Sequence, residues 1–160
     1  MSADMLIRFE EVPAASQPIE GKDIEVQSWS HGFAQPASPT RSTAGRGTIE
    51  QASHQNLTIT KSMDDSSTAI LRACWSGQQF GKAILRCYRG DGAGGRHEYL
   101  SVTMQHVIIS NYSISGGPGD APLENIALDY GTIQYSYNDQ KQGKTAAAPA
   151  THDLVNQKVT

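Results

Sequence analysis

The segment LTITKSMDDSSTAILRACWSGQQFGKAILRC, residues 57–87, changes its hydrophobic period twice and therefore decides the fold. Its first part alternates Leu57 and Ile59 with threonine, which indicates a strand with one buried face. The middle part has the spacing of a helix, whose expected apolar stripe consists of Ile70, Leu71, Cys74 and Trp75. After Gly77 the alternation returns. The segment predicts a strand, one helix and a second strand.

Both ends of this helix carry residues that terminate helices. Asp65 or Ser66 is placed to cap the first amides, and the acidic pair Asp64 and Asp65 complements the helix dipole. Gly77 is placed to end the helix in a left-handed conformation. The two carboxylates therefore need no catalytic role.

Strand patterns dominate the rest of the chain. Further strands are expected at residues 5–9, 23–30, 82–89, 97–110, 111–115 and 123–138. In the last of these, the apolar positions change from even to odd at Gly131, which predicts a glycine bulge. We expect a mainly β fold, a small barrel of two packed antiparallel sheets with one α-helix.

Two segments lack this periodicity. Residues 33–53 are rich in Ala, Ser, Thr, Gly and Pro, and we expect them to form a long flexible contact loop. Residues 139–160 are polar and rich in alanine, and we expect a loose C-terminal tail. The β-barrel domain is accordingly assigned to residues 1–138.

Composition and charge exclude several classes of protein. The chain has 160 residues, 38% of them hydrophobic and 18% charged, which is typical of one globular domain. The net charge is −3 and the 13 Lys and Arg are scattered, so nucleic acid is not expected as a partner. The start MSADMLIRFEE lacks the pattern of a signal peptide, and no stretch approaches 18 apolar residues. We expect a protein made in the cytosol, with Cys74 and Cys87 reduced and no membrane insertion.

The candidate motifs for catalysis, cofactors and metals lack the neighbouring sequence features that those functions require. The glycines of GDGAGG, residues 90–95, precede a strand rather than a helix, so they predict a hairpin turn rather than a phosphate site. His97 and Glu98 lack the second histidine of a zinc helix, and no G-x-S-x-G motif is present. The remaining histidines are His31, His54, His106 and His152, and all five are expected to be surface or hydrogen-bonded residues. We expect no enzyme activity, no cofactor and no metal site.

The segment DIEVQSWSHG, residues 23–32, is unusual for a half-buried strand. Ile24 and Val26 share one face, but Ser28 and Ser30 follow where apolar residues belong, and the other face is mostly polar as well. A β-protein must also close, cover or pair its sheet edges. A ring of identical subunits around a wet lumen accounts for both features and places Ser28 and Ser30 in that lumen. The alternatives are a monomeric ligand-binding barrel and a hydrolase whose site is assembled from distant residues.

The order of these motifs resembles the hemolysin-coregulated protein (Hcp) family, which supplies the tube subunit of the type VI secretion system. The resemblance covers about residues 4–138. Its most specific parts are I-E-V-x-x-W-S at residues 24–30, A-C-x-S-G at residues 73–77 and E-Y-L at residues 98–100.

The resemblance implies a hexameric ring, and stacked rings that form a hollow tube. A contractile sheath on a baseplate expels the tube, capped by a spike tip protein, so the subunit is cytoplasmic before firing and then secreted without a signal peptide. Small effector proteins travel in the lumen, and the effector-binding serine of the family corresponds to Ser30. The loop after this strand reaches toward the adjacent ring, a role that the resemblance transfers to the segment around Arg41 and Arg46.

Overall fold

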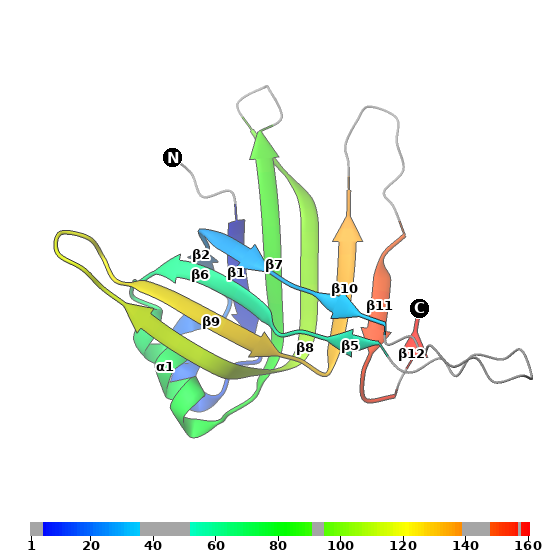
Figure 1. Ribbon diagram of the computed structural model, residues 1–160, viewed down its shortest axis with the longest axis horizontal. Coiled ribbons are helices and arrows are strands. Elements are labelled where there is room, and N and C mark those ends of the chain that lie inside the picture. The colour runs from blue at the N-terminus through cyan, green and yellow to red at the C-terminus, as the bar shows by residue number, and fades with distance from the viewer. Residues whose placement is uncertain (1–4, 36–51, 91–94, 139–147, 157) are drawn as a thin grey trace, which may run out of the picture.

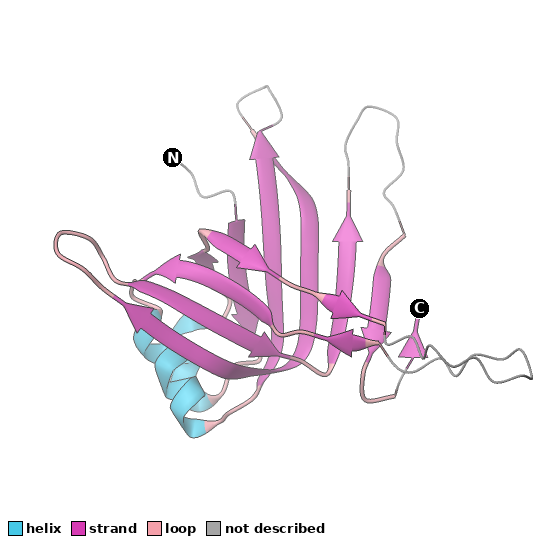
Figure 2. Ribbon diagram, in the orientation of Figure 1, coloured by secondary structure: helices cyan, strands magenta, loops and turns pink. Residues whose placement is uncertain are grey.

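Strands make up most of the chain that the structure describes, together with one α-helix (Figure 2). This computed structural model describes residues 5–35, 52–90, 95–138, 148–156 and 158–160. The helices are η1 (Ala14–Ile19, a 3-10 helix) and α1 (Ser67–Ser76). The strands are β1 (Met5–Glu10), β2 (Asp23–Glu25), β3 (Ser28–Ser30), β4 (Phe33–Ala34), β5 (Ser53–His54), β6 (Leu57–Ser62), β7 (Phe80–Gly90), β8 (Arg96–Ser115), β9 (Leu123–Asp129), β10 (Thr132–Tyr137), β11 (Ala150–Asp153) and β12 (Lys158–Val159).

The strands form two antiparallel sheets that share β8. Sheet A has the order β12-β11-β10-β8-β7-β1-β2, and sheet B has the order β3-β6-β9-β8. In Figure 1, β8 runs along sheet A, bends, and continues as one strand of sheet B, so that the two sheets enclose a common interior. β4 and β5 form a separate two-stranded ribbon. The mainly β architecture with two sheets and one helix confirms the predicted fold class.

Three places where the chain passes from one sheet to the other explain irregularities in the sequence pattern. β8 turns at His106, whose φ of 55° is positive. Gly131 separates β9 in sheet B from β10 in sheet A, and its amide donates to the carbonyl of Gln105 at 3.0 Å. A Cβ at Gly131 would lie 3.3 Å from the Cβ of His106. The predicted bulge within one strand was therefore wrong, because the change of period marks a corner between two strands.

The third corner lies in the DIEVQSWSHG segment. Ile24 and Val26 are buried in the part that pairs with β1, and the chain then enters sheet B as β3. In β3 the inward residue is Trp29, so the inward parity changes from even to odd between Val26 and Trp29. Ser28 and Ser30 consequently point outward. The strand looks polar on both faces because two short strands of opposite parity adjoin.

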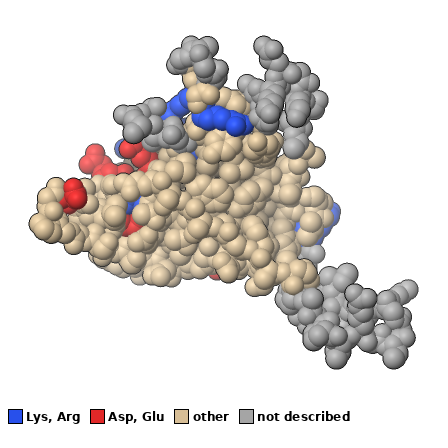
Figure 3. Space-filling view, turned by 45° about the horizontal axis from the view of Figure 1, so that its top comes forward, with Lys and Arg blue, Asp and Glu red and all other residues tan. Residues whose placement is uncertain are grey.

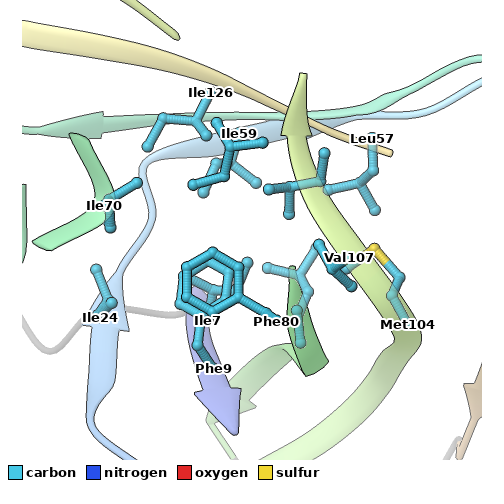
Figure 4. Close-up of a cluster of buried hydrophobic side chains, with 14 of the residues drawn as sticks. Ile7, Phe9, Ile24, Leu57, Ile59, Ile70, Phe80, Met104, Val107 and Ile126 are labelled. Atoms are coloured by element: carbon cyan, nitrogen blue, oxygen red, sulfur yellow. The ribbon is translucent and has the colours of Figure 1, made fainter. Parts of the chain in front are cut away.

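The interior between the sheets is filled by side chains from both. Figure 4 shows Ile7, Phe9 and Phe80 facing Ile59 and Ile126 across this interior. The rings of Phe9 and Phe80 lie 4.6 Å apart between centroids. Each fully buried aliphatic or aromatic side chain of this kind contributes about 1.5–3 kcal/mol relative to exposure. The barrel interior is thus a packed core.

Helix α1 packs against η1 and β8 through small residues. Its buried residues are Ser67, Ala69, Ile70 and Ala73. Trp75 is 77% exposed, so its predicted place on the buried stripe was wrong: two alanines let the helix approach closely, and Trp75 lies about 200° around the axis from Ala73. Gly77 ends the helix with φ 64°, as predicted. Ser66 makes no side-chain cap; instead the Asp64 carboxylate accepts from the Ser66 amide at 2.9 Å.

The C-terminal segment contributes strands that the sequence pattern did not predict. β11 pairs with β10, and β12 pairs with β11, so residues 150–153 extend sheet A instead of forming a loose tail. The boundary of the domain at residue 138 stays a prediction. β7 and β8 pair up to Gly90 and Arg96, in agreement with a hairpin, while residues 91–94 lie outside the described chain. In the described residues, no helix has the length and apolar character needed to span a membrane.

Candidate functional site

The outward face of sheet B is built mostly from small hydroxyl and amide side chains, with Ala127 and the exposed Ile108 and Leu123 as apolar members, and we call it the polar face. Strand register aligns these residues in two rows that cross all four strands. One row is Ser28, Thr60, Asn125 and Ser113; the other is Ser30, Thr58, Ala127 and Asn111. Ser28 and Ser30, the predicted site residues, are exposed and end one side of each row. Strand alternation produces this face, because the inward neighbours in β6 and β9 are buried.

Hydrogen bonds within the polar face fix several of its side chains. Thr60 Oγ1 donates to Asn125 Oδ1 at 2.7 Å, between directly opposite residues. Farther along β8, Asn56 Nδ2 donates to Ser110 Oγ at 2.8 Å. Hydroxyl and amide groups have more donors and acceptors than these contacts use. The face therefore offers neutral hydrogen-bonding groups at fixed positions to whatever lies against it.

The polar face carries almost no charge. Among its described residues only Asp129, at the end of β9, is ionisable. Figure 3 shows one face of the molecule, on which Lys, Arg, Asp and Glu lie mainly near the margins. At one end of the face, a pocket of about 490 Å³ is lined by Gln27, Ser62, Ser115, Gly116, Gly117, Asp120, Ala121 and Leu123. A neutral polar surface can contact many partners without repelling either sign of charge.

Directly beneath the polar face lies a buried ion pair that the sequence analysis missed. Lys61 and Glu124 are opposite each other in the β6–β9 ladder, point inward and are both fully buried. Lys61 Nζ lies 3.0 Å from Glu124 Oε2 and 3.1 Å from Asp64 Oδ1, and it also donates to Ser67 Oγ. Lys61 shares its parity with Leu57 and Ile59, which is the signal that would have revealed its burial.

Two neighbours of this pair have shifted pKa values. Partial burial opposes ionisation of Asp64, but hydrogen bonds from Ser66 and Lys61 outweigh it and hold the pKa of its carboxyl below the ordinary value. Burial and the nearby Glu124 raise the pKa of the Tyr112 phenol. These groups tie the start of α1 to sheet B and support the polar face from below.

Sheet B has two edges without a strand partner in the described part of the chain. One is the outer edge of β3, and the other is the part of β8 that pairs only with β9, residues 108–115. Backbone amides and carbonyls along such edges bind water or a further strand. β3 and β8 run antiparallel in this order of four strands, so the β8 edge of one copy can pair in the antiparallel sense with the β3 edge of another.

Two other expectations concern the predicted stacking residues and the histidines. Arg41 and Arg46, the predicted stacking residues, lie outside the described residues, although β4 and β5 are the two ends of their segment. Three of the five histidines, His31, His54 and His152, lie together, which their spacing in the sequence did not predict. Within the described ranges, no group of three or more His, Cys, Asp or Glu has an arrangement suited to a metal ion.

Comparison with known proteins gives consistent matches over most of the chain. The family model described as "Type VI secretion system effector, Hcp" matches residues 15–137. Protein hcp1 of Pseudomonas aeruginosa is 32% identical over 143 residues, covering 88% of this chain and 86% of that protein. The Major exported protein of the same species is 26% identical over 121 residues, covering 71% and 68%. A solved structure of a type six secretion system protein superposes with a TM-score of 0.82 at 25% identity, covering 99% of this chain and all of that chain.

Proposed function

Because the chain belongs to the Hcp family of the type VI secretion system, we propose that it is the structural subunit of the inner tube, assembled as a hexameric ring. The observation that carries this proposal is the pair of open edges of sheet B beside a neutral, polar outward face. Pairing the β8 edge of one copy with the β3 edge of the next satisfies both edges. It also turns the polar face of every copy toward the same central space.

Simple geometry supports a ring of this kind. Six copies of a four-stranded sheet make about 24 strands, and a spacing of about 4.8 Å between strands gives a circumference of about 115 Å. The corresponding diameter is about 37 Å between backbones, and strand tilt increases it. Such a lumen is wide enough for a small folded protein, whose radius of gyration is about 13 Å for 100 residues.

The polar face is the proposed cargo surface. Ser28 and Ser30 lie at the β3 end of the two rows and would adjoin Asn111 and Ser113 of a neighbouring copy. Neutral hydroxyls in a wet lumen hold a cargo by hydrogen bonds without trapping it through a large apolar contact. Small effector proteins are the proposed cargo.

The remaining parts of the proposal rest on the family. Rings stack through the segment that contains Arg41 and Arg46, and the tube engages a spike tip protein, a contractile sheath and a baseplate. The protein is cytoplasmic before firing and is then secreted through the type VI system, in keeping with the name of the relative called Major exported protein. It acts by assembly rather than by catalysis.

A monomeric ligand-binding barrel is the weaker alternative. Such a protein needs a concave interior site, whereas the interior here is filled by fully buried residues such as Phe9, Phe80 and Met104. Sedimentation velocity combined with electron microscopy tests the proposal. We expect a particle of six times the 17.2 kDa chain mass with a central hole. A single 17.2 kDa species at every concentration would overturn it.

A further inference from the structure

Three histidines and two tyrosines form a continuous chain of hydrogen bonds at the far end of sheet A. Tyr135 OH lies 2.5 Å from His31 Nδ1, and His31 Nε2 lies 2.7 Å from Tyr130 OH. Tyr130 OH lies 2.7 Å from His54 Nδ1, and His54 Nε2 lies 2.7 Å from His152 Nδ1. We call these five residues the histidine–tyrosine chain.

The histidine–tyrosine chain joins parts of the molecule that are distant in sequence. His31 follows β3, and His54 belongs to the β4–β5 ribbon, whose two strands flank the long segment 35–52. Tyr135 and His152 belong to β10 and β11 at the end of sheet A. The ribbon is therefore held on sheet A by imidazole and phenol groups, with the ring of Phe33 packed between His31 and His54.

Counting protons shows that the chain is complete when all three imidazoles are neutral. Each of the four contacts needs one hydrogen, and each neutral imidazole supplies one donor and one acceptor. If Tyr135 donates to His31, then His31 donates to Tyr130, Tyr130 to His54, and His54 to His152. Every contact then has one hydrogen. The reverse direction satisfies the same four contacts equally well.

Adding protons has unequal effects. A first proton can enter at the outer Nε2 of His152, because the chain then adopts the reverse direction and keeps all four contacts. His31 can also be protonated without loss of a contact, because the phenol oxygens of Tyr130 and Tyr135 can accept from it while their own O–H groups turn away. The contact between His54 Nε2 and His152 Nδ1 joins two imidazole nitrogens, so it holds two donors and must open when both rings are protonated. The histidine–tyrosine chain therefore breaks at this one contact, when His54 and His152 are both protonated.

The surroundings oppose protonation of the inner imidazoles. Burial lowers the pKa of His31 to about 4, although the backbone of Gln55 favours its protonated form. Burial and the adjacent His152 lower the pKa of His54. Burial raises the pKa of both phenols, so each stays protonated and neutral near pH 7.

The other titratable groups near the chain do not supply a carboxylate partner to these imidazoles in the described residues. Asp129 lies next to Tyr130 and accepts from its amide. The Asp153 carboxylate accepts from the amides of Val155 and Asn156. Cys87 lies near Tyr135 on the inward face, and His106 lies at the corner beside Gly131.

From this geometry we propose that acid releases the β4–β5 ribbon from β11, by protonating both His54 and His152. This inference goes beyond the proposed function, because it concerns the fold of one chain and holds whether or not rings form. The ribbon flanks the part of the sequence that holds Arg41 and Arg46, the residues that we propose for ring stacking.

Mass spectrometry tests the proposal on the full-length protein. Deuterium exchange at the imidazole carbon reports the pKa of each histidine, and backbone amide exchange, corrected for the intrinsic effect of pH, reports opening of the ribbon. Between pH 7 and pH 4 we expect peptides with β4, β5 or β11 to lose protection by at least about tenfold, while β7 stays protected. We expect the loss to follow the protonation of His54.

Variants make the test specific. His97 contacts the carbonyl of Asn138 at 3.2 Å, away from the chain, so His97→Gln should keep the transition. His54→Gln should shift or abolish it. Ribbon protection that persists to pH 4, or an ordinary pKa near 6.5 for His54, would overturn the proposal. These outcomes do not depend on the particle mass that tests the tube function.

Discussion

Thr60 and Asn125 lie opposite each other on the outside of sheet B, joined by a 2.7 Å hydrogen bond, and the next pair of the same ladder, Lys61 and Glu124, is fully buried inside. One step along two strands thus separates the polar face from a buried ion pair. Lys61 also reaches Asp64 before α1, so the same pair connects the helix to the sheet. The position of the polar face depends on this internal anchor.

Removing one member of the buried pair should lower the free energy of unfolding strongly, whereas replacing both members together should change it little. Lys61→Met leaves the Glu124 carboxylate buried without its partner, and we expect the free energy of unfolding to fall by about 3–5 kcal/mol. The double variant Lys61→Met, Glu124→Leu removes both charges and should recover most of that loss. Urea unfolding at a fixed chain concentration measures both. Equal losses in the single and double variants would contradict a coupled pair.

A β-branched residue at the His106 corner should destabilise the fold. Its φ of 55° lies in the left-handed region, which Asn tolerates and Val does not. We expect His106→Val to lower the free energy of unfolding by about 1–3 kcal/mol, whereas His106→Asn stays close to the wild type. Thermal or urea unfolding compares the two variants. If Val and Asn are equivalent, the corner is not strained in the way described.

Cargo retention should depend on hydrogen bonds at the polar face rather than on charge. Ser30→Arg adds bulk and charge to an exposed site, so we expect rings of unchanged mass that retain less co-purified effector. Asp129 is the only ionisable residue among the described residues of the polar face. Retention of the effector by the wild type should therefore change little between low and high salt. Arg72→Ala, at an exposed position of helix α1, is the control. Full retention by Ser30→Arg would remove this residue from the cargo surface.

Stability should fall on acidification in a window set by His31. Above pH 6.5 the imidazole is neutral in the folded and unfolded states, so it contributes no pH dependence. Between pH 6.5 and about 4 the unfolded chain takes up a proton that the folded chain resists, so the free energy of unfolding decreases. Below about pH 4 this contribution levels off. Urea midpoints at pH 7.5, 6 and 5 should decline less in His31→Asn than in the wild type; an unchanged slope would contradict the assignment.

The sequence predicted the elements better than their assembly. Alternation located β1, β6 and β7, and the helical spacing with Gly77 located α1, because these signals are local. The corners at His106 and Gly131 were missed or misread, since a change of period looks the same for a bulge and for a passage between sheets. Strand β11 was missed because its pairing with β10 comes from tertiary contact rather than from its own weak pattern.

The candidate site was only partly accessible from sequence. Ser28 and Ser30 stood out because they interrupt an apolar pattern, but the rows that they begin include Asn125 and Asn111, which strand register alone brings beside them. The sequence pattern did not predict the histidine–tyrosine chain for the same reason, because His31 and His152 are far apart in the sequence.

Engineered cysteines at the two edges of sheet B test the central claim most directly. In a Cys74→Ser background that retains the buried Cys87, one variant pairs Ser28→Cys with Ser113→Cys and another pairs Ser30→Cys with Asn111→Cys. As a control, Ser28→Cys is combined with Trp75→Cys, which lies on the exposed side of α1.

If the β8 edge of each copy joins the β3 edge of the next, mild oxidation of at least one edge pair yields a covalent ladder that stops at six chains, while the control stays uncrosslinked. If neither edge pair gives more crosslinked product than the control, sheet B does not close into a ring and the proposed lumen does not exist.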